Sequence, residues 1–534
     1  MKKKILPYLF CASALALTLA ACGAQQTAQT GVEGAAALTF TDSGITAQDG
    51  TTGYEIDGTA LTITESGTYA VSGSCADGSI KIKKGTTGVT LILNGIDLTS
   101  GDTAAITCAK STEVTILAAD GTQNALSDGE QNNDENYPDN ADAENAVIKC
   151  KDGSSVTLGG TGELTIAANG KNGIKSGAAT DEDGEASLTI RDLTLTIDAP
   201  VNDAINAEQL LNIESGTLTI DAADDAVHCD LTLTVGADGT DGPSITVSGC
   251  YEGLEAAELN VLSGNIDITA SDDCLNAANA DLSGYDFAMT ISGGTIRAFT
   301  SAGDGFDSNG SLTIAGGTIA VWTASAADNE PLDADGTITV TGGTVLAAGG
   351  SAGMGMNVEA AQSCVIYSMG GGMSGFPERA GKTQTADDST QDAGAASVAK
   401  GAVLSIQSAS GDTLFSGEAP CDVRFVFFSS PDLTAEESYT LLSDGDSVTA
   451  ADAQSGTIST GRDGMGGFPG GQRPADGRQL GEPPEGLDGE RPERPSGETP
   501  DFSDGERPEL PEGSPDRQDG DAAPPQNAAG ENSV

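Results

Sequence analysis

A six-residue motif, Asp224-Asp-Ala-Val-His-Cys229, decides the fold because it recurs along the chain. Each copy joins small or acidic turn residues to one apolar anchor, one polar residue and one small residue. The anchors are Ile174, Ile205, Val227, Leu254, Leu275, Phe306 and Leu332, and successive anchors are 31, 22, 27, 21, 31 and 26 residues apart. A repeat of this length built from β-forming residues predicts a solenoid, in which equivalent side chains of neighbouring repeats stack into columns.

The residues on either side of this motif alternate apolar and polar side chains. Ser215-Gly-Thr-Leu-Thr-Ile220 precedes it and Leu231-Thr-Leu-Thr-Val235 follows it. Period-two runs of Thr, Val, Ile and Leu between Gly, Asn and Asp indicate strands and turns. Each repeat therefore holds three short strands, which predicts an all-β parallel β-helix. Side chains of one parity fill its interior, and side chains of the other parity face solvent.

The N-terminus has the three parts of a lipoprotein signal peptide. Lys2 to Lys4 are basic, Ile5 to Leu19 are apolar, and Leu19-Ala-Ala-Cys22 closes the segment. The apolar run is too short for a spanning helix, so we interpret residues 1–22 as a cleaved signal and Cys22 as the lipidated residue. An ordinary secretory signal is the alternative. The sequence thus predicts an exported lipoprotein on the extracellular face of the cell membrane, which contacts the membrane through its lipid anchor only.

Composition divides the rest of the chain into further segments. Twelve of the twenty prolines lie beyond Gly461, interleaved with Gly and charged residues, which is typical of disorder. Two apolar runs, Val403–Ile406 and Val423–Phe428, are typical of a β cap, which solenoids need at an open end. The expected order is a tether at 23–45, the β-helix at 46–365, a flexible loop at 366–400, the C-terminal β cap at 401–455 and a disordered acidic Pro/Gly-rich tail at 456–534.

Charge and residue counts exclude several classes of function. The formal net charge of −56 makes nucleic acid and anionic lipid headgroups poor partners and cations good ones. A single histidine, His228, argues against a Ser-His-Asp hydrolase, and an aromatic content of 4% argues against an aromatic binding platform. The ten cysteines include no CxxC pair, so a zinc ribbon is excluded, while disulfides remain open.

Acidic residues recur at fixed positions around the anchors. Two residues before each anchor from Ile205 onwards the side chain is always Asp or Glu, and one residue after the anchors carboxylate or amide oxygen is common. Neighbouring coils are separated by roughly 4.8 Å, so bare carboxylates would repel one another. Calcium prefers about six to eight oxygen ligands. We therefore predict calcium bound between neighbouring coils, by Asp203 with Asp225, by Glu252 and Glu255 with Asp273 and Asn276, and by Asp304 and Asp307 with Asp333.

An alternative holds that Asp and Asn merely cap their own turns at the corners. It explains a single site such as Asp225 or Asp273, but it explains less well the paired acids of consecutive repeats. Lys171 and Lys175 are basic residues near the acidic column. A polysaccharide lyase needs an unprotonated base beside a metal ion that acidifies its substrate, so these lysines are the candidate catalytic residues of that alternative. A solvated surface lysine is the default interpretation of each.

Three features resemble one known family. They are the acidic motifs, as in Asp272–Ala277 and Asp304–Ser308, the Gly-Gly-Thr strand starts at Gly293, Gly316 and Gly342, and the late segment from Leu414-Phe415 to Phe427-Phe-Ser-Ser-Pro431. Together they are similar to the carbohydrate-binding right-handed parallel β-helix proteins of clostridia and related Firmicutes, and the resemblance covers roughly residues 45–450. It implies a fold like that of pectate lyases, calcium binding, and attachment to plant cell-wall polysaccharide without clear cleavage activity.

The resulting hypothesis is a lipid-anchored extracellular protein that binds polysaccharide through calcium, with polygalacturonate or cellulose as candidate ligands. Acidic plant glycans are favoured because calcium would bridge their uronate groups to the acidic columns. A pectate-lyase-like enzyme remains the catalytic alternative, although the chain lacks a basic cluster. A surface scaffold or adhesin in which calcium only holds the coils together is the structural alternative.

Overall fold

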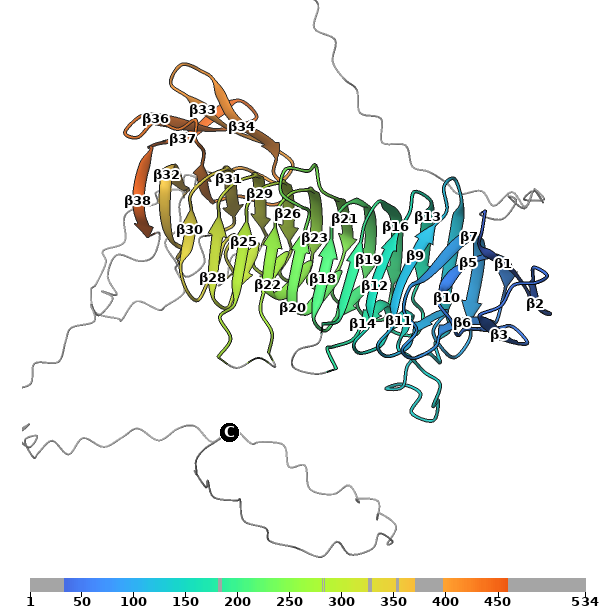
Figure 1. Cartoon of the computed structure of the whole chain (residues 1–534). Helices are drawn as coiled ribbons and strands as arrows, with labels where there is room; N and C mark the ends of the chain where they lie inside the picture. Colours follow the sequence, from blue (N-terminus) through green and yellow to red (C-terminus); the bar gives the residue numbers. More distant parts are fainter. Residues whose placement is uncertain are drawn as a thin grey trace, which may run out of the picture. The chain divides into compact units, whose positions relative to one another are not determined.

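The computed structural model describes residues 33–180, 185–280, 282, 284–324, 329–351, 355–369 and 397–459. The predicted signal peptide with Cys22, most of the predicted loop at 366–400 and nearly all of the predicted tail lie outside these residues. Every regular element in the described part is a β-strand (Figure 1). No helix among the described residues is long and apolar enough to cross a membrane.

The strands form a parallel β-helix, as the repeat predicts. A mostly parallel sheet of 34 strands winds through three columns, and each coil contributes one strand to each column. The motif column carries the repeated motif. Its strands are β4 (Ala60–Ile63), β6 (Ser79–Ile82), β8 (Ile106–Cys108), β11 (Ala146–Cys150), β14 (Asn172–Ser176), β17 (Ile205–Ala207), the first parts of β20 (Val227–Val235) and β22 (Leu254–Val261), β24 (Leu275–Ala277) and β27 (Phe306–Ser308).

Two further columns complete each coil. The second column holds β9 (Glu113–Ala118), β12 (Ser155–Gly159), β15 (Ser187–Ile190), β18 (Leu210–Ile213), the later parts of β20 and β22, β25 (Ala288–Ile291), β28 (Ser311–Ile314), β30 (Ile338–Val340) and β32 (Asn357–Ser368). The third holds β10 (Gln123–Asp128), β13 (Glu163–Ala167), β16 (Leu193–Ala199), β19 (Gly216–Ala222), β21 (Ser244–Gly249), β23 (Asn265–Ala270), β26 (Thr295–Thr300), β29 (Thr318–Thr323) and β31 (Thr344–Gly349). β5 (Gly67–Cys75) and β7 (Val89–Ser100) run through both.

The apolar anchors point into the interior of this stack. Val227, Leu254, Phe306 and Leu332 have no exposed side-chain area and belong to one continuous core. Small residues before the anchors are required by close approach of the next coil. A Cβ added at Gly253 would lie 2.1 Å from the carbonyl oxygen of Cys274, which no side chain tolerates. The eight cysteines of the described residues are all buried free thiols.

The N-terminal boundary of the folded part differs from the expected tether at 23–45. β1 (Ala36–Thr41) lies inside that segment and β2 (Gly44–Ala47) begins in it, and β1 pairs in parallel with β5. Leu38 and Phe40 are fully buried, because alternate residues of β1 continue the interior of the first coil. Antiparallel pairs between β1 and β2, and between β3 (Tyr54–Asp57) and β4, complete this end. The tether is therefore shorter than the composition suggested.

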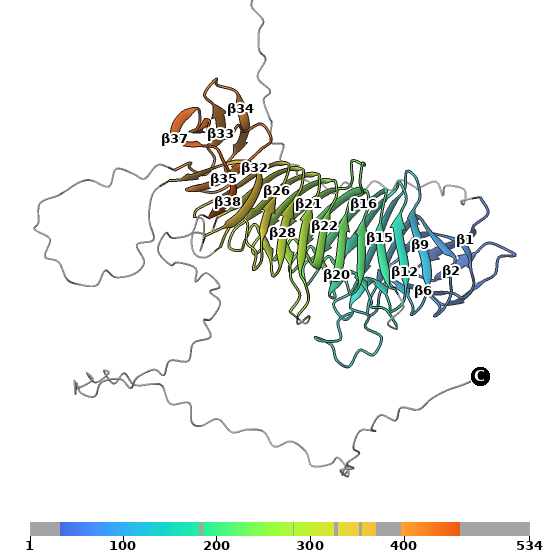
Figure 2. The ribbon, with the colours of Figure 1, turned by 60° about the vertical axis from the view of Figure 1, so that its left-hand side comes forward.

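The C-terminal cap has two parts (Figure 2). β35 (Phe425–Ser429) and β38 (Gln454–Ser459) continue the main sheet by antiparallel pairing with β31 and β32, so the cap extends past the predicted boundary at 455 to at least Ser459. β33 (Val403–Ser408), β34 (Thr413–Glu418), β36 (Ser438–Ser443) and β37 (Asp446–Asp452) form a separate antiparallel sheet. Its apolar side chains form a second core with Trp322, Leu346 and Ala348, which point outward from the third column. The cap therefore also covers one flank of the last coils.

Replacing the anchor Phe306 by alanine is expected to destabilise the stack strongly, because it removes a fully buried aromatic side chain and leaves a cavity between coils. The loss should be about 3–5 kcal/mol in the free energy of unfolding. Chemical denaturation followed by circular dichroism measures it. Ile56→Ala, at a position that is 38% exposed, is the matched control and should stay within about 0.5 kcal/mol of the wild type. Equal effects of the two changes would contradict the assigned interior.

Candidate metal centre and binding face

The outward side chains of the motif column form one continuous row, here called the ladder. Strand register places each of them beside its equivalent on the next coil. In order the ladder is Lys81, Thr107, Lys149, Lys175, Asn206, His228, Glu255, Asn276 and Asp307. An isolated bridge between Phe306 and Leu332 brings Asp333 to its end. The ladder is basic in its first half and acidic in its second, and the change of sign occurs at His228.

Two ladder lysines, Lys81 and Lys149, were not among the predicted site residues. Each directly follows an apolar anchor of an early coil, Ile80 or Ile148. Their position one residue after an anchor could have identified these lysines in the sequence. The motif is degenerate there, because the acid two residues before the anchor is replaced by Gly78 or Ala146. The basic half of the ladder is thus a result of strand register.

The acidic residues two positions before the anchors interact with the next coil. The Oδ1 atom of Asp273 accepts a hydrogen bond of 2.6 Å from the backbone N–H of Asp304. Asp203 accepts a longer one of 3.3 Å from Asp225, and Asp304 accepts one from the backbone N–H of Glu330. The alternative that these acids satisfy corner amides is therefore partly right, although the amides belong to the neighbouring coil. One oxygen of each carboxylate serves this purpose.

The cluster Asp304–Asp307–Asp333 is the most concentrated acidic group of the face. One carboxylate oxygen from each residue lies within 4.8 Å of the other two. Burial, together with the neighbouring carboxylates, raises the pKa of Asp304 to about 7 and that of Asp307 to about 6. None of the three has an ion pair with a lysine or arginine of the described residues. Their negative charge is thus left without a positive partner from the described part of the chain.

Asn276 lies beside this cluster and leaves one oxygen without a donor. Its side chain is 6% exposed, and its Nδ2 donates to Glu252 Oε2 at 2.8 Å. Its Oδ1 is buried and has no hydrogen-bond partner. Burial raises the pKa of Glu252 to about 8 and that of Asp273 to about 7. A buried acceptor without a donor costs about 1–3 kcal/mol, so a further donor or a cation at this oxygen would be stabilising.

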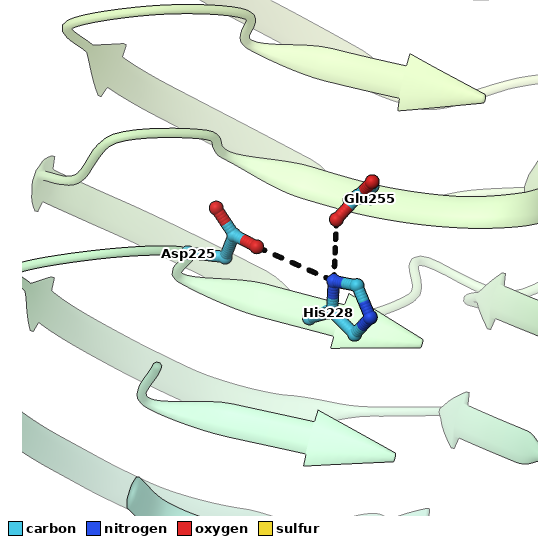
Figure 3. Close-up of side chains that lie close together, drawn as sticks. All are labelled: Asp225, His228 and Glu255. Carbon is cyan, nitrogen blue, oxygen red and sulfur yellow. Dashed lines mark hydrogen bonds and ion pairs between the residues drawn. The ribbon is translucent and has the colours of Figure 1, made fainter. Parts of the chain in front are cut away.

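The cluster around His228 is neutralised in a different way (Figure 3). The Nδ1 atom of His228 faces Glu255 Oε2 and lies 3.3 Å from Asp225 Oδ2, and its Nε2 lies 2.9 Å from Asp230 Oδ1. Burial by itself would lower the pKa of His228, but the three carboxylates raise it far above its ordinary value. The ring is therefore an imidazolium that donates on both sides. Its positive charge neutralises the surrounding carboxylates, as a metal ion would do in an acidic cluster without a histidine.

This arrangement divides the predicted ligand set differently from the sequence analysis. Glu255 was expected to group with Asp273 and Asn276, but it turns towards His228, its register neighbour on the preceding coil. Asp203 and Asp225 come together as expected, with Asp224 as a third member. Burial and the charge of Asp225 raise the pKa of Asp203 to about 6.

The lysines of the catalytic alternative are engaged by acids. Lys171 Nζ lies 2.5 Å from Glu135 Oε1, and Lys175 Nζ lies 3.8 Å from Glu208 Oε1. Lys149 is half-buried beside Lys175, and burial and that neighbouring ammonium lower its pKa. The lowered pKa makes the neutral form of Lys149 more accessible than that of an ordinary lysine, although Lys149 was not a predicted site residue.

A calcium ion fits the acidic end of the ladder. The donors there are carboxylate and amide oxygens, which this hard cation prefers, and they come from adjacent coils. The unpartnered Asn276 Oδ1 and the uncompensated charge of Asp304, Asp307 and Asp333 are the observations that favour a cation. The His228 cluster fits calcium less well, because an imidazolium already occupies its centre.

Comparison with known proteins gives three matches. A family model for "Carbohydrate-binding domain-containing protein" matches residues 57–353. A curated protein of the same description from Acetivibrio thermocellus is 35% identical over 127 residues, which are 24% of this chain and 43% of that protein. The chain therefore spans less than half of the length of this relative. A solved structure of the polysaccharide lyase-like protein from C. thermocellum, a gadolinium derivative, is 26% identical with a TM-score of 0.31, covering 58% of this chain and 93% of that one.

The raised pKa values predict that the metal-free protein loses stability as pH rises. Unfolded Asp has a pKa of about 4, so the folded state holds these protons more tightly. Their stabilisation is complete below about pH 4 and is lost as pH rises through about 6 to 7. The melting temperature in chelator should therefore fall by several degrees between pH 5 and pH 8, as scanning calorimetry would measure.

Asp304→Asn tests the origin of this effect, because it removes one buried charge and keeps an acceptor for the Glu330 amide. It should raise the metal-free melting temperature at pH 8 and weaken the pH dependence. Asp198→Asn, on the exposed outward face of β16, is the control and should change neither. A wild-type melting temperature that rises from pH 5 to pH 8 would contradict the assignment.

Proposed function

Because the chain belongs to the family of carbohydrate-binding domain-containing proteins, we propose that it binds polysaccharide along the ladder and holds calcium at the acidic end. The observation that supports this most directly is the cluster Asp304–Asp307–Asp333 with the adjacent Asn276. It is a concentrated oxygen site without a cation from the described residues. It lies in line with the rest of the ladder, so a bound ion and an extended ligand would share one face.

The charge of the ladder distinguishes this face from the second column. From β7 to β30 the middle outward residue of successive strands is threonine or asparagine, and only β32 places a charged residue, Glu359, in this row: Thr90, Thr115, Thr157, Thr189, Asn212, Thr234, Asn260, Thr290, Thr313 and Thr339 make up the uncharged part. Such a row offers hydroxyl and amide groups but no charge. The last strands of the third column are covered by the C-terminal sheet. The motif column is therefore an accessible face on which the charge changes from basic to acidic along one continuous row.

Two inserted loops also distinguish the motif column from the other columns. The loop of residues 129–145 precedes β11, and the loop of residues 278–287 precedes β25, at corners that bound the motif column. The described parts of both loops lie on the same side of the stack in Figures 1 and 2. Binding residues are often carried by loops on a rigid scaffold. The ladder would thus form the floor of the binding face, and these loops its edges.

Calcium would supply the positive charge that an acidic polysaccharide needs here. The chain carries a net charge of −56, so a uronate chain would be repelled without a bridging cation. Asp304, Asp307 and Asp333 would hold the ion, with Asn276 close by, and Lys149 and Lys175 would offer direct positive charge farther along the same row. We propose acidic plant cell-wall glycans as the ligand class, and an exported, lipid-anchored location through Cys22.

A polysaccharide lyase is the second candidate, and one observation favours it. Lys149 lies beside Lys175 on the ladder with a lowered pKa, which suits a general base. Incubation with polygalacturonate and calcium would then form unsaturated products that absorb in the ultraviolet. Loss of this absorbance in Lys149→Ala, with retention in Lys400→Ala at an exposed site in the cap, would establish the enzyme. No absorbance from the wild type would exclude it under those conditions.

Binding to polygalacturonate is expected to depend on calcium and on the acidic end of the ladder. In affinity electrophoresis the wild type should be retarded with calcium and released by chelator. The double variant Asp304→Asn/Asp307→Asn should bind about tenfold more weakly in calcium, because it loses two anionic ligands of the ion. Asp198→Asn removes one charge on another face and should bind as the wild type does.

Two outcomes would count against parts of this proposal. Undiminished binding in chelator would remove the role of calcium and leave the carbohydrate ligand. Failure to bind polygalacturonate, cellulose and neutral cello-oligosaccharides would overturn polysaccharide binding itself. In that case a melting temperature that calcium raises and no sugar changes would favour the structural alternative.

A further inference from the structure

Exposed aromatic side chains gather around the motif column. Aromatic residues are scarce, and most of those described are buried or half-buried. Among the described residues the exposed ones are Tyr137, Tyr251 and Tyr285, which are 37%, 48% and 38% exposed. Tyr137 lies in the loop before β11, Tyr251 at the corner before β22, and Tyr285 in the loop before β25. All three therefore belong to segments that border the motif column.

Tyr251 is held in place at one edge of the column. Its backbone N–H donates to Asp224 O at 2.8 Å, and its carbonyl accepts from Asp272 N–H at 2.9 Å, so it replaces the acid found at this position on both neighbouring coils. The nearby carboxylate of Asp272 raises the pKa of its hydroxyl. Its ring is the most exposed aromatic side chain of the described residues. The two backbone hydrogen bonds fix the position at which this ring is attached, so less conformational freedom is lost on binding than from a free loop.

Tyr285 lies at the opposite edge. Its loop leaves β24, the strand that pairs with β22, and leads to β25. The start of the loop turns back towards earlier coils, because Asn279 Nδ2 donates to Asp230 O at 2.9 Å, and Asp230 also binds His228. The ring of Tyr285 packs on Phe287 at 5.5 Å between centroids with a tilt of 55°. Tyr251 therefore lies at the corner before the motif-column strand that carries Glu255, and Tyr285 lies in the loop after the one that carries Asn276.

Polysaccharides present surfaces that suit this arrangement. A pyranose ring has a face of C–H groups and an edge of hydroxyls, so it pairs with a side chain that has an apolar body and a polar tip. Exposed aromatic rings gain by losing contact with water, and aromatic residues are common among the residues that line ligand sites. Carboxylates and amides between the two rings would accept or donate hydrogen bonds to the hydroxyls. Building on the proposed function, we infer that Tyr251 and Tyr285 stack on sugar rings of the bound polysaccharide.

This inference separates two contributions to binding. The calcium contribution requires charge on the ligand and disappears in chelator. The tyrosine contribution requires only sugar rings, persists in chelator and is insensitive to salt, because it does not involve ionic attraction. Neutral cello-oligosaccharides should therefore bind through the tyrosines alone, and polygalacturonate should use both.

Isothermal titration with cellohexaose in chelator, and with polygalacturonate in calcium, tests this on the full chain. Tyr251→Ala and Tyr285→Ala should each weaken binding of either probe about fivefold to tenfold. Tyr251→Phe should retain most of the affinity, since it keeps the ring and loses only the hydroxyl. Ile56→Ala, which removes an exposed apolar side chain from β3, is the matched control and should bind like the wild type.

A second readout follows the rings directly. Cellohexaose should protect Tyr251 and Tyr285 of the wild type from nitration, as mapped by mass spectrometry. Wild-type binding that both alanine variants retain in full, without protection of either ring, would overturn the inference and leave the proposed function intact. A wild type that binds neither probe would overturn the proposed function, and this inference with it. If an alanine variant has a lowered melting temperature, the inference is tested instead by the affinity of Tyr251→Phe relative to the wild type and by the nitration pattern.

Discussion

In-register hydrogen bonding between successive coils is the constraint on which the rest of this structure depends. It places every residue of one strand beside its equivalent on the next, at the roughly 4.8 Å spacing of a sheet. Inside the stack the result is a continuous core of residues such as Val227, Leu254 and Phe306. Outside it, the same register stacks charges regardless of sign. Much of the chemistry of the motif column follows from how those stacked charges are separated or neutralised.

The chain uses several means along one row. Amides separate charged neighbours, as Asn206 does between Lys175 and His228 and as Asn276 does between Glu255 and Asp307. Backbone N–H groups of the following coil take one oxygen of Asp203, Asp273 and Asp304. Lys171, Lys175 and His228 pair with acids. Asp304, Asp307 and Asp333 form no ion pair with a cationic side chain of the described residues, so their charge is not compensated in this way.

The position of the uncompensated charge connects stability with ligand binding. Buried carboxylates that hold protons up to about pH 7 make the metal-free face less favourable at neutral pH, and a divalent ion would remove that cost. The ion would at the same time reverse the local charge of a strongly acidic protein. With the proposed ion bound, this member of the carbohydrate-binding family would offer an acidic ligand a cation, two lysines and exposed aromatic rings near one column of a rigid scaffold.

Much of this could be predicted from the sequence, and the rest could not, for a physical reason. The spacing of the anchors from Ile174 to Leu332 determined the solenoid, the three strands per coil and the parity of each side chain, because these depend on local alternation and repeat length. The acidic columns followed directly. Only the tertiary structure decided that Glu255 turns to His228, that Lys149 stands beside Lys175, that β1 joins the first coil, and that Tyr251 and Tyr285 border one face. Such contacts join different coils through corners and loops of unequal length, and a local pattern does not specify them.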